Sequence, residues 1–133
     1  MERDPLVDDA ASRRLGVLVV SEDPAVALAV EQRLRGLHQV RVAMSAQKAL
    51  VEIKREPPDV VVCDQAIAPV TADELFEIIA TFFPKVRRVL QVEWRLGSGL
   101  GPTMKGLLER GLAEAVVDRA ASLEHLLAAI RPA

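Results

Sequence analysis

The sequence predicts an α/β domain with a five-stranded parallel sheet that is doubly wound, with helices on both faces. Short apolar runs of strand length alternate five times with stretches of helical periodicity between residues 15 and 130. Two of these runs are apolar at almost every position, which is typical of strands buried on both faces. Parallel strands need crossover connections, and helices supply them, so the alternation indicates this fold class.

Length and composition are consistent with one such domain. Half of the 133 residues are apolar, and a chain of this length buries roughly two-thirds of its unfolded surface. The net charge of −2 argues against general nucleic-acid binding. The single cysteine, Cys63, excludes an internal disulfide, and no apolar run is long enough to cross a membrane. We expect a flexible segment over residues 1–14, which does not resemble a signal peptide, and one cytoplasmic domain over residues 15–133.

Three runs in the first half of the chain have strand length: Leu15–Val20, His38–Ala43 and Val60–Cys63. Asp23 and Ser45 are N-cap residues for the two helices between them, and Pro24 suits the first helical position. Gly36 marks the end of the first helix, and Pro57-Pro58 stops the second. The apolar residues expected on their inner faces are Val26, Val30, Leu34 and Leu37, then Ala46, Leu50 and Ile53.

Two further strands are predicted in the second half, Arg88–Val92 and Ala113–Val117. Thr71 and Glu74 form a capping box that begins one helix, which Pro84 ends. Pro102 begins the next helix, and Ser122 caps the last. The inner faces are expected to carry Leu75, Ile78, Ile79 and Phe82, then Met104, Leu107 and Leu108, then Leu123, Leu126, Leu127 and Ile130.

Acidic residues follow the first and third strands, where a ligand site is expected. In a sheet of strand order 2-1-3-4-5, ligands bind beyond the carboxyl ends of the strands, between the first strand and the third. The first strand ends in Ser21-Glu22-Asp23, and the third ends in Asp64. These side chains are therefore candidates for a functional site.

Four stretches of the chain resemble a known family: VLVVSEDP, SAQKALVEIKREPPDVVVCD, RVLQV and ERGLAEAVVD. Together with the order of the elements, they resemble the response-regulator receiver domain, the CheY-like phosphoacceptor of bacterial two-component signalling, from about residue 15 to residue 130. The resemblance implies the flavodoxin/CheY-like fold, in agreement with the pattern of strands and helices.

The resemblance places the family's phosphoacceptor aspartate at Asp64. The family's acidic pair, which binds a divalent cation, falls on Ser21 and Glu22, so one carboxylate of the pair is lost. Glu22, Asp23 and Asp64 are the candidates for a retained Mg²⁺ site, although Asp23 is more simply an N-cap.

Other positions of the family's active site differ more strongly. Glu93 stands where the family has a hydroxyl residue, and Asp118 stands at the position of its lysine. Arg119 takes the place of the proline that follows, and Ala115 that of the switch aromatic. Two like charges about 4 Å apart repel by roughly 4 kcal/mol at an effective dielectric of about 20, so Asp118 opposes phosphotransfer where the lysine would assist it.

Five acids are expected to crowd one crevice: Glu22, Asp23, Asp64, Glu93 and Asp118. Three arrangements could stabilise them. Arg119 or Arg95 could turn inward to pair with Asp64 or Asp118, a divalent cation could bind, or one carboxylate could take up a proton. We favour the arginine.

Several other residues have two interpretations each. The segment GSGLG at residues 97–101 resembles a phosphate-cradling loop, but a mobile connection is the better interpretation because the flanking motif is missing. Trp94 is either a partner anchor or a packed side chain. We expect His38 and His125 at the surface, and Cys63 in the core.

The sequence therefore predicts an atypical receiver-like signalling domain, not an enzyme, that acts by protein–protein contact without phosphorylation and without a cofactor. In the family, the fourth helix, fifth strand and fifth helix mediate partner or dimer contact, and here that face includes Leu107, Arg110, Glu114, Glu124 and His125. One alternative is a working phosphoacceptor, which receives a phosphoryl group on Asp64 from a histidine kinase. A second is a small-ligand or metal sensor.

Overall fold

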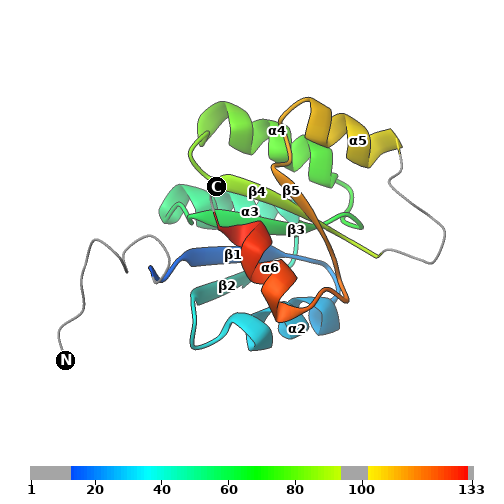
Figure 1. Ribbon diagram of the computed structural model, residues 1–133. Helices are drawn as coiled ribbons and strands as arrows, with labels where there is room; N and C mark the ends of the chain where they lie inside the picture. The colour runs from blue at the N-terminus through cyan, green and yellow to red at the C-terminus, as the bar shows by residue number, and fades with distance from the viewer. Residues whose placement is uncertain (1–12, 94–101, 132–133) are drawn as a thin grey trace.

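The computed structural model describes residues 13–93 and 102–131, and within them five parallel strands form one sheet in the order β2-β1-β3-β4-β5 (Figure 1). The strands are β1 (Gly16–Val20), β2 (Gln39–Ala43), β3 (Val60–Asp64), β4 (Arg87–Val92) and β5 (Ala115–Asp118). The helices are α2 (Pro24–Leu34), α3 (Ala46–Arg55), α4 (Ala72–Phe82), α5 (Pro102–Glu109) and α6 (Leu123–Ile130). The predicted fold class and strand order are confirmed. The flexible segment expected over residues 1–14 lies outside the described residues, apart from its last two.

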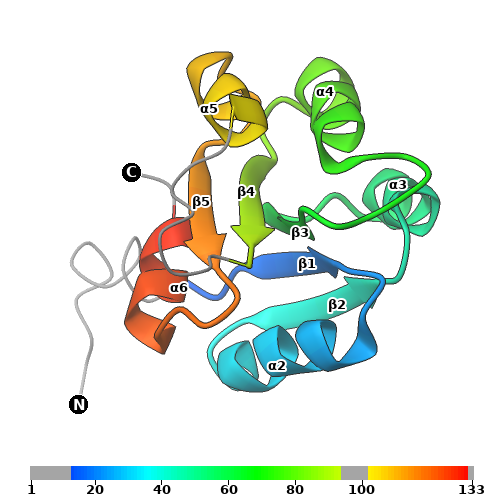
Figure 2. The ribbon, with the colours of Figure 1, turned by 90° about the vertical axis from the view of Figure 1, so that its right-hand side faces the viewer.

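Two helix layers cover the sheet. Helices α2 and α6 lie on one face, and α3, α4 and α5 lie on the other (Figure 2). On β1, Leu18 and Val20 point toward α3 and α4, whereas Val17 and Val19 point toward α2 and α6. This alternation follows from the two-residue period of a strand, and it explains why the β1 sequence is apolar throughout.

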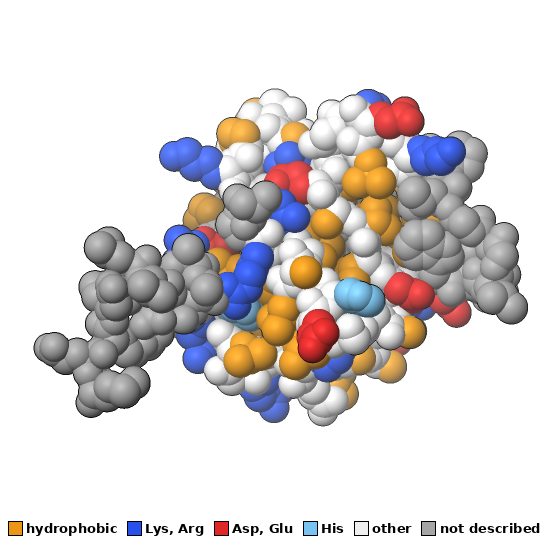
Figure 3. All heavy atoms as spheres, in the orientation of Figure 1, with side chains coloured by type: hydrophobic (Ala, Val, Ile, Leu, Met, Phe, Trp, Pro, Cys, Tyr) orange, Lys and Arg blue, Asp and Glu red, His pale blue; other side chains and the backbone are white. Residues whose placement is uncertain are grey.

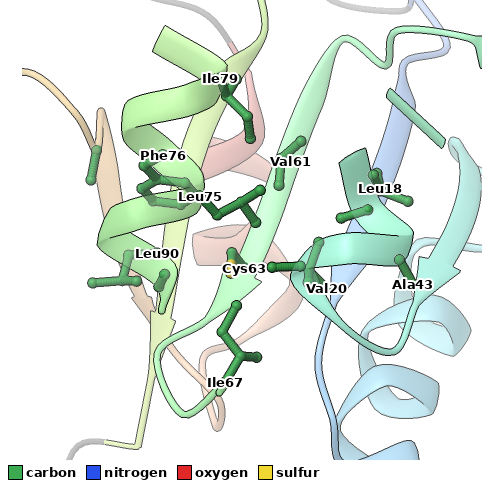
Figure 4. Close-up of a cluster of buried hydrophobic side chains, with 14 of the residues drawn as sticks. Leu18, Val20, Ala43, Val61, Cys63, Ile67, Leu75, Phe76, Ile79 and Leu90 are labelled. Atoms are coloured by element: carbon green, nitrogen blue, oxygen red, sulfur yellow. The ribbon is translucent and has the colours of Figure 1, made fainter. Parts of the chain in front are cut away.

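The larger of the two cores lies under α4. Leu75, Phe76 and Ile79 pack against side chains of β3 and β4 and are fully buried (Figure 4). Each such side chain contributes about 1.5–3 kcal/mol through the surface that it removes from water. The sheet is therefore anchored from the α4 side, and the site at the carboxyl ends of the strands is built on a rigid base.

The four helix caps expected from the sequence are all present. Asp23 accepts a hydrogen bond from the backbone N–H of Ala25, and Ser45 accepts one from Lys48. Ser122 accepts from the N–H of His125. The capping box of α4 has both of its reciprocal bonds. The caps explain why the predicted helix starts agree with the structure, because each satisfies N–H groups that the first turn leaves unpaired.

Three apolar residues expected on inner helix faces are exposed instead: Leu37, Phe82 and Leu123, with exposed fractions of 48%, 70% and 37%. Each lies at or beyond the end of a helix, where the chain turns away from the sheet. Helix α2 ends at Leu34, and Gly36 adopts a φ of +90°, so Leu37 leaves the helical periodicity.

Within residues 13–93 and 102–131, no helix is both long enough and apolar enough to span a membrane.

Candidate functional site

Four polar residues share one face of the sheet at its carboxyl edge: Ser21, Asp64, Gln91 and Arg119. The residue two positions before each of them belongs to the core under α2 and α6: Val19, Val62, Val89 and Val117. Since side chains alternate along a strand, the four polar side chains lie on that same face. The strand ends thus bring together residues that are up to 98 positions apart in the chain, Ser21 and Arg119.

Asp64 forms a two-pronged ion pair with Arg119. The Arg119 Nη2 atom lies 2.6 Å from Asp64 Oδ2, and Nε lies 3.2 Å from Oδ1. The Asp64 side chain is only 2% exposed, and that of Arg119 is 25% exposed. Both carboxylate oxygens of Asp64 are therefore engaged. The expected inward-turning arginine is confirmed and is Arg119, whereas Arg95 lies outside the described residues.

Ser21 supports the same carboxylate from β1. Its side chain is fully buried, and its hydroxyl lies 3.4 Å from Asp64 Oδ2 and 3.3 Å from the carbonyl oxygen of Asp23. The backbone N–H of Asp23 donates back to the Ser21 hydroxyl at 3.2 Å. A neutral hydroxyl thus occupies the position where the resemblance predicts an acid.

The charge of Arg119 is fixed by its surroundings. The hydrogen bond to Asp64 raises the pKa of the guanidinium, and the negative charges of Asp64, Glu93 and Asp23 raise it further, against the opposing effect of burial. Glu93 lies 3.6 Å from Arg119 Nη1, but its side chain is 59% exposed, so this contact contributes little. Glu93 therefore acts as an outer partner of the arginine.

The other acids turn away from Asp64, so the expected crowding of five acids is wrong. The exposed Glu22 accepts a hydrogen bond from the backbone N–H of Ala68. Asp23 caps α2, and Asp118 Oδ1 accepts from the N–H of Ala120 at 3.1 Å. In the part of the chain that the structure describes, no group of three or more His, Cys, Asp or Glu side chains is arranged to hold a metal ion.

A second arginine, Arg33 on α2, holds the turn that carries Arg119. Its guanidinium donates to the carbonyl oxygen of Arg119 at 3.3 Å and to that of Ala121. Asp118 and Ala120 are bonded within the same turn. The turn between β5 and α6 is thus fixed from two sides. No local pattern in the sequence indicates this role of Arg33, because its partners lie 86 and 88 residues away.

Gln91 is the other residue that the sequence analysis missed. It lies on β4 opposite Asp64 in the strand register, it is 1% exposed, and its side-chain oxygen has no hydrogen-bond partner. The signal was a single polar residue inside the apolar run RVLQV. Buried polar atoms are rarely left unpaired. The side-chain oxygen of Gln91 is such an exception, and it lies on the strand beside the ion pair.

The expected interaction face is only partly at the surface. Leu107 is buried in the core, which corrects its place in that face, whereas Glu124 and His125 are exposed. Arg110 and Glu114 are exposed and engaged in ion pairs. A cavity of about 690 Å³ lies along β5 and α6. Figure 3 shows hydrophobic side chains exposed over these two elements.

The remaining expectations concern single residues and one short segment. Cys63 is a core residue as predicted, and burial raises the pKa of its thiol far above the usual value. His38 is not at the surface, contrary to the prediction, but 3% exposed, while His125 is exposed as predicted. Trp94 and the glycine-rich segment 97–101 lie outside the described residues.

The strand order and the two helix layers are those of the flavodoxin/CheY-like α/β fold, which solved response-regulator receiver domains share. No protein-family model and no curated protein matches the sequence. The fold class therefore rests on the comparison with solved structures.

Three solved receiver domains illustrate the similarity. The receiver domain of an HD domain-containing protein from Pseudomonas fluorescens Pf-5 is 19% identical, with a TM-score of 0.77 over 90% of this chain and 93% of that one. The CheY-like receiver domain from Methanospirillum hungatei JF-1 is also 19% identical, with a TM-score of 0.74 over 87% and 90%. The receiver domain of the putative regulator NarL from Mycobacterium tuberculosis is 17% identical, with a TM-score of 0.73 over 89% and 94%.

Proposed function

We propose that this chain is an atypical receiver domain that signals through protein–protein contact and does not use Asp64 as a phosphoacceptor. The observation that carries the proposal is the ion pair between Asp64 and Arg119. A carboxylate that attacks a phosphoryl group needs a free oxygen with a clear approach, but both oxygens of Asp64 contact the guanidinium and the side chain is 2% exposed.

The charges around Asp64 support the same proposal. Phosphoryl transfer needs cations that neutralise the charge on the transferred group. Asp118 and Glu93 stand at the positions where the resemblance predicts a lysine and a hydroxyl, and neither side chain can supply positive charge to a phosphoryl group. Arg119 is the only cation that contacts Asp64 within the described residues, and it is already committed to the carboxylate.

The donor set also does not fit Mg²⁺ in the arrangement that the family uses. A hard cation needs several oxygen ligands that converge on one point. Ser21 replaces one acid with a neutral hydroxyl, Glu22 is bound to the N–H of Ala68, and Asp64 is paired with Arg119. Our proposal therefore includes no metal ion at this site.

The partner in this proposal is a protein that contacts the surface formed by β5 and α6. Together with Arg33, the ion pair holds the turn between these two elements in one conformation. The cavity beside them is lined mostly by alanine and valine residues, and the polar residues of its wall are Arg87, Asp118, Ser122 and His125. A fixed turn next to a preformed apolar cavity favours constant binding over binding that depends on phosphorylation.

Incubation with acetyl phosphate and Mg²⁺, followed by intact-protein mass spectrometry, tests the proposal. We expect no phosphoryl adduct on the wild type under conditions that fully modify a conventional receiver domain. An adduct on the wild type that the Asp64→Asn variant lacks would overturn the proposal. The Arg119→Ala variant is tested in the same experiment. A phosphoryl adduct on this variant alone would show that the arginine prevents phosphorylation of Asp64.

A further inference from the structure

A second hollow lies at the opposite end of the sheet from Asp64, where β1 and β2 begin. Its volume is about 610 Å³, and it lies between the C-terminal end of α2 and the loop that leads into β3. The charged and titratable residues that line it are Arg14, Glu31, Arg35, His38, Arg41, Glu56 and Asp59. Nothing in the function proposed above uses this hollow.

The carboxylates of the hollow are already paired. Their arginine partners are Arg35 for Glu31 at 3.1 Å, Arg13 for Asp59 at 2.6 Å and Arg41 for Glu56 at 3.8 Å. Arg14 also lines the hollow, but it makes no ion pair or hydrogen bond with any of the residues 13–93 and 102–131. Three arginines and three carboxylates line the hollow, and among these arginines Arg14 is the one without a carboxylate partner in the described residues.

His38 contributes an unused hydrogen-bond donor. Its Nδ1 atom accepts a hydrogen bond from the backbone N–H of Leu15 at 3.0 Å, so the neutral ring carries its proton on Nε2. This Nε2 atom is buried and has no hydrogen-bond partner. An unpaired buried donor is unfavourable, and an acceptor atom placed beside it would remove the penalty.

The electrostatic surroundings of the ring favour an acceptor with negative charge. Burial lowers the pKa of His38, and the positive charges of Arg131 and Arg14 lower it further. The two guanidinium groups are thus near enough to act on the ring. A donor N–H in a positive field is best satisfied by an oxygen that carries negative charge.

We propose that this hollow binds a small oxyanion, a carboxylate or a phosphate, whose oxygen accepts from His38 Nε2 and whose charge is neutralised by Arg14. Because Nε2 is buried, an oxygen reaches it through a small turn of the ring or a shift of its neighbours. That adjustment should shift the NMR signals of the residues around the ring when an anion binds. The site lies at the opposite end of the sheet from Asp64, so the test of this site does not depend on the role of Asp64.

Titration of the ¹⁵N-labelled protein followed by NMR tests the proposal, with inorganic phosphate and acetate as separate probes and chloride at matched ionic strength as the control salt. We expect saturable shifts of the Leu15 and His38 amides with at least one of the two anions, and none with chloride. Saturation by phosphate alone or by acetate alone supports the site and identifies its ligand. No saturable shift with either anion would overturn it.

Two variants sharpen the experiment without threatening the fold, since both residues are exposed. Arg14→Gln is expected to weaken binding by about tenfold, because a charge-assisted contact is lost. Arg110→Gln is the control: this exposed arginine pairs with Glu77 and does not line the hollow, so its loss should change the affinity less than about twofold. Equal affinities of the wild type and Arg14→Gln would contradict the proposed site.

Discussion

Replacing Arg119 with alanine removes the cation that both oxygens of Asp64 contact and leaves a buried carboxylate without its partner. Removing one member of a buried ion pair costs about 3–5 kcal/mol of unfolding free energy. Arg119 is 25% exposed, so water can replace it in part, and we expect a loss near the lower limit, about 3 kcal/mol. The contact of Arg119 with the exposed Glu93 adds less than about 1 kcal/mol.

A second substitution separates the lost pair from the stranded charge. Asp64→Asn removes the buried charge and leaves Arg119 partly in water, with an expected loss of about 1 kcal/mol. The double variant should then be more stable than Arg119→Ala alone, because its buried side chain is neutral. Urea denaturation followed by far-UV circular dichroism measures all four proteins. An Arg119→Ala variant within about 0.5 kcal/mol of the wild type, the usual range of surface substitutions, would refute this reasoning.

Three further predictions test other parts of the structure. Burial, aided by two nearby arginines, keeps the pKa of His38 below 6.5, so the unfolded chain takes up a proton that the folded one does not. The unfolding free energy should therefore fall as the pH drops below about 6.5, and it should level off below the lowered pKa. A His38→Gln variant should lose this dependence on pH, whereas a His125→Gln variant, changed at an exposed position, should keep it. Phe76→Ala should lower the unfolding free energy by about 3–5 kcal/mol, because the ring is fully buried. Phe82→Ala, at a position that is 70% exposed, should change it by less than about 0.5 kcal/mol. Similar losses in the two variants would contradict the assigned core. Arg33→Gln should speed amide hydrogen exchange in the turn between β5 and α6 but not in α3, and unchanged exchange there would show that the arginine does not hold the turn.

Local chemistry explains which parts of the fold were predictable. Asp23, Ser45, Thr71 and Ser122 each bond to a backbone N–H within three residues, so a helix start is encoded within a few neighbouring positions. Strands buried on both faces are apolar throughout, which made β1 and β3 recognisable. The strand order followed from the alternation of strands and helices together with the family resemblance.

Contacts between distant residues explain what the sequence did not predict. Arg119 and Arg95 were the two candidate partners for Asp64. The path of the chain after β5 places the Arg119 guanidinium beside the carboxylate, and this path is not encoded in a local pattern. The burial of His38 depends on Leu15, 23 residues earlier, whose N–H binds its ring. Leu37 and Phe82 follow a helical pattern to its last turn, but the pattern does not say where the helix leaves the sheet.

The pairing of Asp64 with Arg119 has a consequence for how the chain can fold. One partner ends the third strand, and the other lies after the fifth, with β4 between them. In an intermediate that forms β1 to β4 before β5 docks, Asp64 has no cation, so its carboxylate must stay hydrated or be buried at a high cost in free energy. The last strand and helix are therefore needed to complete the electrostatics of the first three strands, and a fragment that stops after Val92 should not be stable by itself.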